Sequence, residues 1–281
     1  MLKKLLKYDL KSMVRLLVPL SLAVIGTTIA GTAALRGIQS VNDVRHGSWI
    51  LNSTLAILFA STILALIAYV FFSQILIMYR YYTNLFTDEG YLTFTLPAKT
   101  SSVLTAKVIN AIIWSTYTFV ILFLCIFIYA AFGSADTGLI NVEFFSGIKR
   151  FLNAAAEEYS AGIIVKYVIE GIVFYIVAML YSTLSIYLAL TIGSIIAKKH
   201  KILASIGIYY AINTVMSMFM MIVNGILMFT DLYPVYVSAY EANVTGILDT
   251  VFIINAGSFL IFAIAAYYLT RHLLKNKLNL S

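Results

Sequence analysis

Charged residues are scarce in this sequence. Asp, Glu, Lys and Arg make up 11% of its 281 residues and 62% are hydrophobic, whereas a soluble domain carries about 25% charged and about 45–50% apolar residues. The mean hydropathy is +0.94. A chain of this composition cannot cover a soluble fold with polar side chains. The sequence therefore excludes a soluble protein and indicates an integral membrane protein.

Cysteine, histidine and the common catalytic motifs are also scarce. Cys125 is the single cysteine and lies in an apolar run, which excludes a disulfide framework and a cysteine-ligated metal site. The three histidines are too far apart to give a ligand spacing. No GxxxxGKS/T motif is present to hold nucleotide phosphates. We therefore expect no catalytic residue, bound cofactor or metal on this chain, so any energy source is a partner or an ion gradient, or there is none.

Six apolar segments are long enough to cross a bilayer, which takes about 20 residues. They lie at 16–35, 54–79, 108–132, 167–195, 203–229 and 248–270. The fourth and fifth are joined by a tight hairpin at 197–201. We predict an all-α polytopic membrane protein with six transmembrane helices in a single transmembrane domain, 1–281.

Basic residues are unevenly shared between the two sides of these spans. Of the 19 Lys and Arg residues, 14 fall on the side of the N-terminus and five on the other. Because cytoplasmic loops are enriched in basic residues, we expect both termini in the cytoplasm. The loop at 80–107 is then cytoplasmic, and the loops at 133–166 and 230–247 face outward.

The first 15 residues have opposite basic and apolar helical faces. Lys3, Lys7, Lys11 and Arg15 form an i,i+4 row opposite a row of leucines. This pattern predicts an amphipathic elbow helix, 1–15, lying at the membrane interface. A plain membrane anchor is the simpler alternative. Asp9 falls in the apolar sector, where an acid needs a partner, and is a candidate contact point.

The cytoplasmic loop carries several specified features. Asp88 and Glu89 suit the positive end of a helix, Gly90 allows a sharp turn, and Pro97 ends whatever precedes it. The loop also exposes apolar side chains, at Tyr91, Leu92, Phe94 and Leu96. Apolar groups clustered on a cytoplasmic surface usually mark an interface or a membrane-lying segment. An ordinary solvated loop is the alternative.

The run NLFTDEGYLTFTLPAKTSSVLTAKVINA resembles the first cytoplasmic loop of type 2 ABC permeases from Firmicutes, and the opening KYDLKSM resembles their elbow helix. The likeness in span number and topology covers essentially the whole chain. The local motif match covers about 35 residues.

This resemblance implies the membrane subunit of an ABC exporter in the bacterial plasma membrane. Two permease chains, identical or related, would assemble with two P-loop ATPase subunits that bind ATP and Mg. The loop would form a coupling helix that seats on the ATPase and passes on its ATP-driven closure. Carried over by position, the contacts are Asp88, Glu89, Gly90, Tyr91, Leu92, Leu96 and Pro97. The cargo does not transfer, and no nucleic acid is expected.

Ion-coupled transport, by a secondary carrier or a channel subunit, is the main alternative. Such carriers keep ionisable groups near the midplane, and the candidate is Glu170, near the outer end of the fourth span. An i,i+4 pair with Lys166 at the interface is the simpler interpretation. A membrane enzyme or assembly factor has little support.

Polar residues also recur on the fifth span. Tyr209, Asn213, Ser217 and Asn224 lie roughly on one face. They either pack helix against helix or line a cargo path beside adaptable methionines.

The two outer loops have patterns of their own. Residues 144–160 are predicted to form an amphipathic helix. Residues 230–247 form a re-entrant hairpin, as the resemblance implies, or an ordinary loop.

Overall fold

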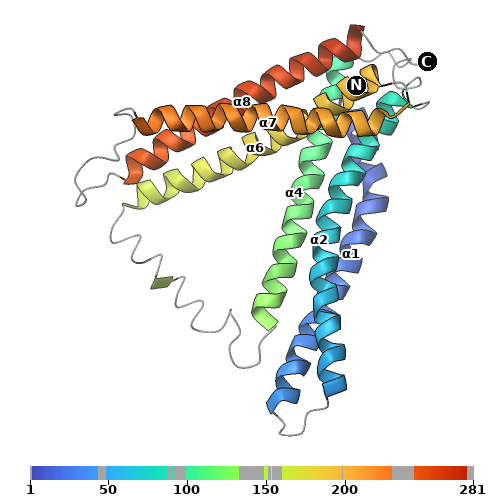
Figure 1. Ribbon diagram of the computed structural model, residues 1–281, viewed down its shortest axis with the longest axis vertical. Coiled ribbons are helices and arrows are strands. Elements are labelled where there is room, and N and C mark those ends of the chain that lie inside the picture. Colours follow the sequence, from blue (N-terminus) through green and yellow to red (C-terminus); the bar gives the residue numbers. More distant parts are fainter. Residues whose placement is uncertain are drawn as a thin grey trace. The chain divides into compact units, whose positions relative to one another are not determined.

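The described residues form six long helices. The computed structural model describes residues 2–43, 49–87, 90, 99–132, 149–150, 153, 160–197, 199–229 and 244–276. The helices are α1 (Leu2–Asp43), α2 (Trp49–Phe86), α4 (Thr100–Phe132), α6 (Ala161–Ile196), α7 (Lys201–Phe229) and α8 (Val244–Asn276). Each contains a segment long and apolar enough to cross a membrane, which confirms the predicted all-α fold (Figure 1).

The helices extend beyond the predicted spans at several ends. α1 runs from the predicted elbow through Pro19 into the first span, although proline removes one helical hydrogen bond. α8 begins at Val244, so residues 244–247, which were expected in an outer loop, form its first turn. The rest of that loop, 230–243, and most of the predicted outer helix, 144–160, lie outside the described residues.

The helices belong to two compact units. Unit 1 contains Met1–Leu5, Met78–Ile112 and Lys166–Ser281, and unit 2 contains Leu6–Ile77 and Ile113–Val165. The division falls inside α1, α2, α4 and α6. Unit 1 therefore holds α7, α8 and nearly all of α6 side by side, together with the last turns of α2 and the first turns of α4 (Figure 1).

Unit 2 packs α1 against α2 and α4 through small, aromatic and hydroxyl side chains. Val24, Tyr69 and Cys125, one from each helix, form a buried cluster. Close by, the hydroxyls of Ser21 and Tyr117 are 2.7 Å apart. Hydrogen bonds of this kind hold helices together where lipid offers no competing partner.

In unit 1, α6 and α7 cross closely at Gly193. A Cβ added to this glycine would lie 2.7 Å from the backbone Cα and N of Ser205. Farther along, the Tyr181 hydroxyl of α6 donates to Asn213 Oδ1 of α7 at 3.1 Å. The Tyr181 ring also stacks on Phe259 of α8, with centroids 5.0 Å apart. A single α6 side chain thus contacts both neighbouring helices.

Most of the apolar surface on these helices is exposed. In the most apolar 18-residue segment of each of these helices, between 6% and 28% of the residues are buried inside the protein. Leu64 and Ile261, for example, are 67% and 69% exposed. Contact between this much apolar surface and water would be unfavourable. These faces therefore contact lipid or another chain.

Candidate functional site

Gly90 is the part of the predicted ATPase contact that the structure describes; Asp88, Glu89, Tyr91, Leu92, Leu96 and Pro97 lie outside the described residues. Gly90 is buried, and its N–H donates to the Thr87 carbonyl at 2.7 Å. A Cβ would lie 2.6 Å from the Leu85 carbonyl oxygen. Glycine is needed at this position because there is no space for a Cβ. It is not needed for an unusual backbone conformation, because none of the described glycines has a positive φ. The chain therefore turns back tightly against the end of α2.

A stacked pair of tyrosines joins the end of α2 to α6. The rings of Tyr81 and Tyr187 are 3.6 Å apart and 7° from parallel, and both side chains are almost fully buried. The Tyr81 hydroxyl is also 3.0 Å from the Thr191 hydroxyl. Thr191 already donates to the Tyr187 carbonyl at 2.7 Å, so Tyr81 is the donor in this bond. The stack and the hydrogen bond together fix the last turns of α2 on α6.

The start of α4 is fixed to both α6 and α8. The Tyr187 hydroxyl donates to the Lys107 carbonyl at 3.2 Å. On the α8 side, the Tyr267 hydroxyl is 2.9 Å from the Thr105 hydroxyl. Thr105 donates to the Ser101 carbonyl at 2.8 Å, and the Tyr267 hydroxyl also donates to that carbonyl at 3.4 Å. We refer to Tyr81, Tyr187, Tyr267, Thr105 and Thr191 as the tyrosine cluster.

The tyrosine cluster lies at both ends of the loop that joins α2 to α4. α2 ends at Phe86 and α4 begins at Thr100, so each end of the loop is within two turns of a cluster residue. Hydrogen bonds in a buried, low-dielectric environment are strong and costly to leave unmade. A displacement of the helix ends that flank the loop therefore either moves α6 and α8 or breaks these contacts.

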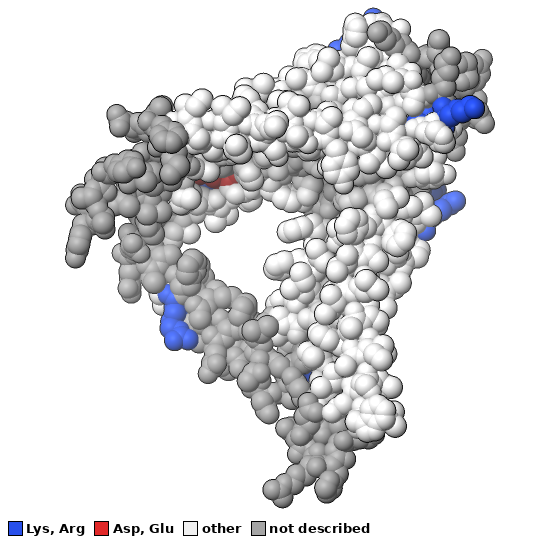
Figure 2. All heavy atoms as spheres, in the orientation of Figure 1, with Lys and Arg blue, Asp and Glu red and all other residues white. Residues whose placement is uncertain are grey.

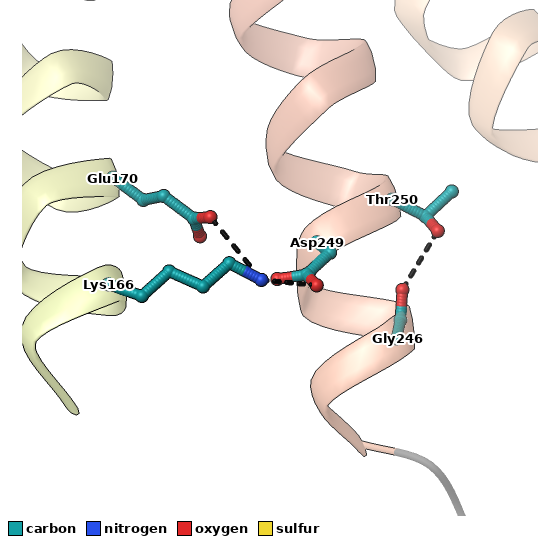
Figure 3. A network of polar contacts seen from close by, with 5 residues as sticks. All are labelled: Lys166, Glu170, Gly246, Asp249 and Thr250. Carbon is teal, nitrogen blue, oxygen red and sulfur yellow. Dashed lines mark hydrogen bonds and ion pairs between the residues drawn. The ribbon is translucent and has the colours of Figure 1, made fainter. Parts of the chain in front are cut away.

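An ion-pair triad joins α6 to α8 at the opposite end of unit 1 (Figure 3). The Lys166 ammonium lies 2.5 Å from the Asp249 carboxylate and 3.7 Å from Glu170. Glu170 is thus within an i,i+4 pair, as the simpler interpretation of the sequence has it. The sequence did not identify Asp249 as the closer partner, because 83 residues separate it from Lys166.

The polar residues predicted on one face of the fifth span have different surroundings. Asn213 accepts from Tyr181 on α6 and donates to the Tyr209 carbonyl at 2.9 Å. Asn224 donates to the Met220 carbonyl of its own helix at 2.8 Å. Ser217 is exposed. Asn213 therefore joins α7 to α6, and a cargo path along this face of α7 stays a prediction.

The N-terminal segment differs in part from the predicted elbow. Lys7 and Lys11 are exposed, as expected for a basic face. Asp9, Met13 and Leu17, which follow one another at i,i+4 spacing, are buried. This face of α1 packs within the protein, and the interfacial position of the segment stays a prediction. The burial of Asp9 agrees with its place in the apolar sector.

Comparisons with known proteins add no relative: no family model, curated protein or solved structure matches this chain. The fold and the exposed apolar surface define the class of protein. The chain is an integral membrane protein that crosses the membrane several times, with six candidate spans among its described residues.

Proposed function

We propose that this chain is the permease subunit of a bacterial ABC exporter, powered by a separate P-loop ATPase. Two permease chains pair in the membrane, and the ATPase seats on the cytoplasmic loop at Asp88–Pro97. ATP and Mg bind to the ATPase, whose closure displaces the loop. The displacement then moves α6 and α8 and opens the cargo path outward.

The tyrosine cluster is the observation that supports this proposal. A loop that only connects two spans needs no fixed attachment to other helices. Here the end of α2 is bonded to α6 through Tyr81. The start of α4 is bonded to α6 through Tyr187 and to α8 through Tyr267. These contacts make a short mechanical path from the loop to the α6–α8 bundle.

The turn at Gly90 also supports a docking role. Its backbone packs against the Leu85 carbonyl, so the chain is fixed against the end of α2 at this residue. A binding surface benefits from such preorganisation, because less conformational freedom is lost on association. The apolar side chains of the loop would then serve as anchors in pockets of the ATPase.

Ion coupling is less well supported by the same structure. A carrier of that kind needs a carboxylate that can exchange protons or ions near the midplane. Glu170 instead shares the Lys166 ammonium with Asp249 near the start of α6. This arrangement fits an interhelical ion pair near a membrane surface.

The test of this proposal is whether substitutions in the loop alone weaken ATPase binding. Truncating one interface anchor typically costs about 2 kcal/mol, which is about 30-fold in the dissociation constant. We expect Tyr91→Ala with Leu96→Ala to weaken ATPase binding at least that much, and Asp88→Lys with Glu89→Lys to do so through charge. Affinity is measured between the purified permease and the ATPase that co-purifies with it.

Tyr268→Ala with Leu269→Ala is the matched control. It removes the same residue types from exposed positions on α8 and should leave ATPase binding unchanged. The thermal stability of all three variants should stay close to that of the parent protein, since the loop is outside the spans. Normal ATPase binding by both loop variants would refute the docking role and favour an ion-coupled carrier.

A further inference from the structure

The turn between α6 and α7 forms a groove beside the end of α2. It has a volume of about 570 Å³ and is lined by Tyr82 of α2, the turn residues 199–201, and Ile202, Leu203 and Ile206 of α7. We refer to it as the basic groove, after Lys199, His200 and Lys201. The function proposed above gives this groove no role.

The basic groove carries positive charge. Among the described residues, Lys199, His200 and Lys201 form no ion pair with a carboxylate. α7 begins at Lys201 and has no acidic residue in its first turn, so the helix dipole adds to the positive potential. A phosphate or another anion is the complementary ligand for such a site.

Apolar side chains continue directly from the charged part of the groove. Ile202, Leu203 and Ile206 are 53%, 69% and 48% exposed. They follow the three basic positions along the first turns of α7. The groove is therefore amphipathic, with cations at the turn and an exposed aliphatic surface running along the span. A soluble anion would occupy the cationic part of the groove and leave the aliphatic surface uncovered.

The groove has a rigid base. α6 and α7 are in backbone contact at Gly193 and Ser205, and the Ala197 N–H donates to the Gly193 carbonyl at 3.0 Å. At the other end of the turn, the Ala204 N–H donates to the His200 carbonyl at 3.0 Å. These bonds fix the backbone on both sides of the turn, so this part of the groove is formed before a ligand binds.

The two ends of unit 1 carry different charges. Basic side chains lie toward the end at which α7 begins, and acidic atoms are visible toward the end at which α6 begins (Figure 2). Along the chain, the turn that forms the basic groove lies between the apolar span of α6 and the apolar span of α7. A turn between two spans lies at the level of the lipid headgroups, and basic pockets between spans are suited to anionic headgroups there.

We propose that the basic groove binds an anionic phospholipid. The phosphate lies against the 199–201 turn, and an acyl chain lies along the apolar residues of α7. Tyr82 brings α2 into the same site, so a bound lipid would contact the end of α2 and the α6–α7 turn at once. The proposal requires no ATPase and stands independently of the function proposed above.

Native mass spectrometry of the purified chain, titrated with phosphatidylglycerol or phosphatidylcholine, tests this proposal. We expect one phosphatidylglycerol to bind more tightly than any phosphatidylcholine. In Lys199→Gln/His200→Gln/Lys201→Gln this lipid should bind about 30-fold more weakly, which corresponds to about 1 kcal/mol for each of the two lysines. Circular dichroism verifies that the variant keeps its helices.

Arg271→Gln/His272→Gln/Lys275→Gln is the matched control. It also removes two permanent cations and one histidine, all from exposed positions on α8. Because these residues line no part of the basic groove, the tight phosphatidylglycerol should bind as it does to the parent protein. An equal loss in both variants would show a diffuse charge effect and overturn the proposal.

Two further outcomes would overturn the lipid assignment. If soluble glycerol phosphate binds as tightly as phosphatidylglycerol, the apolar part contributes nothing and the groove is a site for soluble anions. If the groove variant keeps its phosphatidylglycerol but loses ATPase binding, the groove accepts an acidic protein surface instead. Loss of phosphatidylglycerol with ATPase binding unchanged supports the proposal and separates it from the docking role of the loop.

Discussion

A methyl group added at Gly193 should push α6 and α7 apart. The new Cβ would lie 2.7 Å from the backbone Cα and N of Ser205, atoms that cannot rotate away as a side chain can. Overpacking of this kind typically costs about 1–3 kcal/mol, and a backbone obstacle places Gly193→Ala at the upper end. Alanine gains about 1 kcal/mol in helix propensity over glycine. We expect a net destabilisation of about 2 kcal/mol.

Gly171→Ala is the matched control for this prediction. It lies in the same helix, and a Cβ added there meets nothing within 4 Å. The control should therefore be neutral or about 1 kcal/mol more stable. Both variants are compared by equilibrium unfolding in the same detergent, followed by circular dichroism. Equal stability of the two variants would refute the close crossing of α6 and α7.

Removal of the Ser205 side chain should rescue Gly193→Ala incompletely. Ser205→Gly takes away the hydroxyl, but the Ser205 backbone atoms remain in the path of the new methyl group. Full recovery of stability in the double variant would show that the side chain, and not the backbone, is the obstacle.

Three further predictions concern other parts of the chain. Asp249→Asn should lower the melting temperature more than Glu170→Gln, because Asp249 is the nearer and interhelical partner of Lys166; the reverse order would contradict this geometry. Gly90→Ala should weaken ATPase binding at least tenfold and leave the melting temperature of the isolated permease within a few degrees, since the obstacle lies at the start of the loop; normal binding would argue against the turn. In a Cys125→Ala background, Ser160→Cys should react with an impermeant thiol reagent from outside and Asn276→Cys from inside, and the opposite pattern would reverse the predicted topology.

The fold was predictable because each span has a signal of its own. An apolar run of sufficient length identifies a membrane helix without any knowledge of its neighbours, and every predicted span lies within a helix of the structure. Helix ends are set by weaker effects. α8 begins before its predicted span, at Val244, because no charge or proline stops the helix there.

The contacts between helices were not predictable in the same way. Gly193 and Gly171 look alike in sequence, yet one lies against Ser205 and the other faces open space. Tyr81, Tyr187 and Tyr267 are three of 20 tyrosines, and no local pattern marks them as a cluster. Lys166 and Asp249 meet across 83 residues. Each of these contacts depends on how the helices pack against one another, and no short stretch of sequence specifies that packing.

The most direct test of the account is an ATP-dependent distance within unit 1. Spin labels at Val168 on α6 and Ile253 on α8, which are 58% and 65% exposed, report movement of the bundle in a Cys125→Ala background. With the ATPase bound, ATP should change the distance between the labels. Tyr81→Phe with Tyr267→Phe should bind the ATPase normally but show a smaller change, because the loop is then less firmly attached to α6 and α8. An unchanged distance in the parent protein, or an equal change in the tyrosine variant, would contradict the proposed coupling.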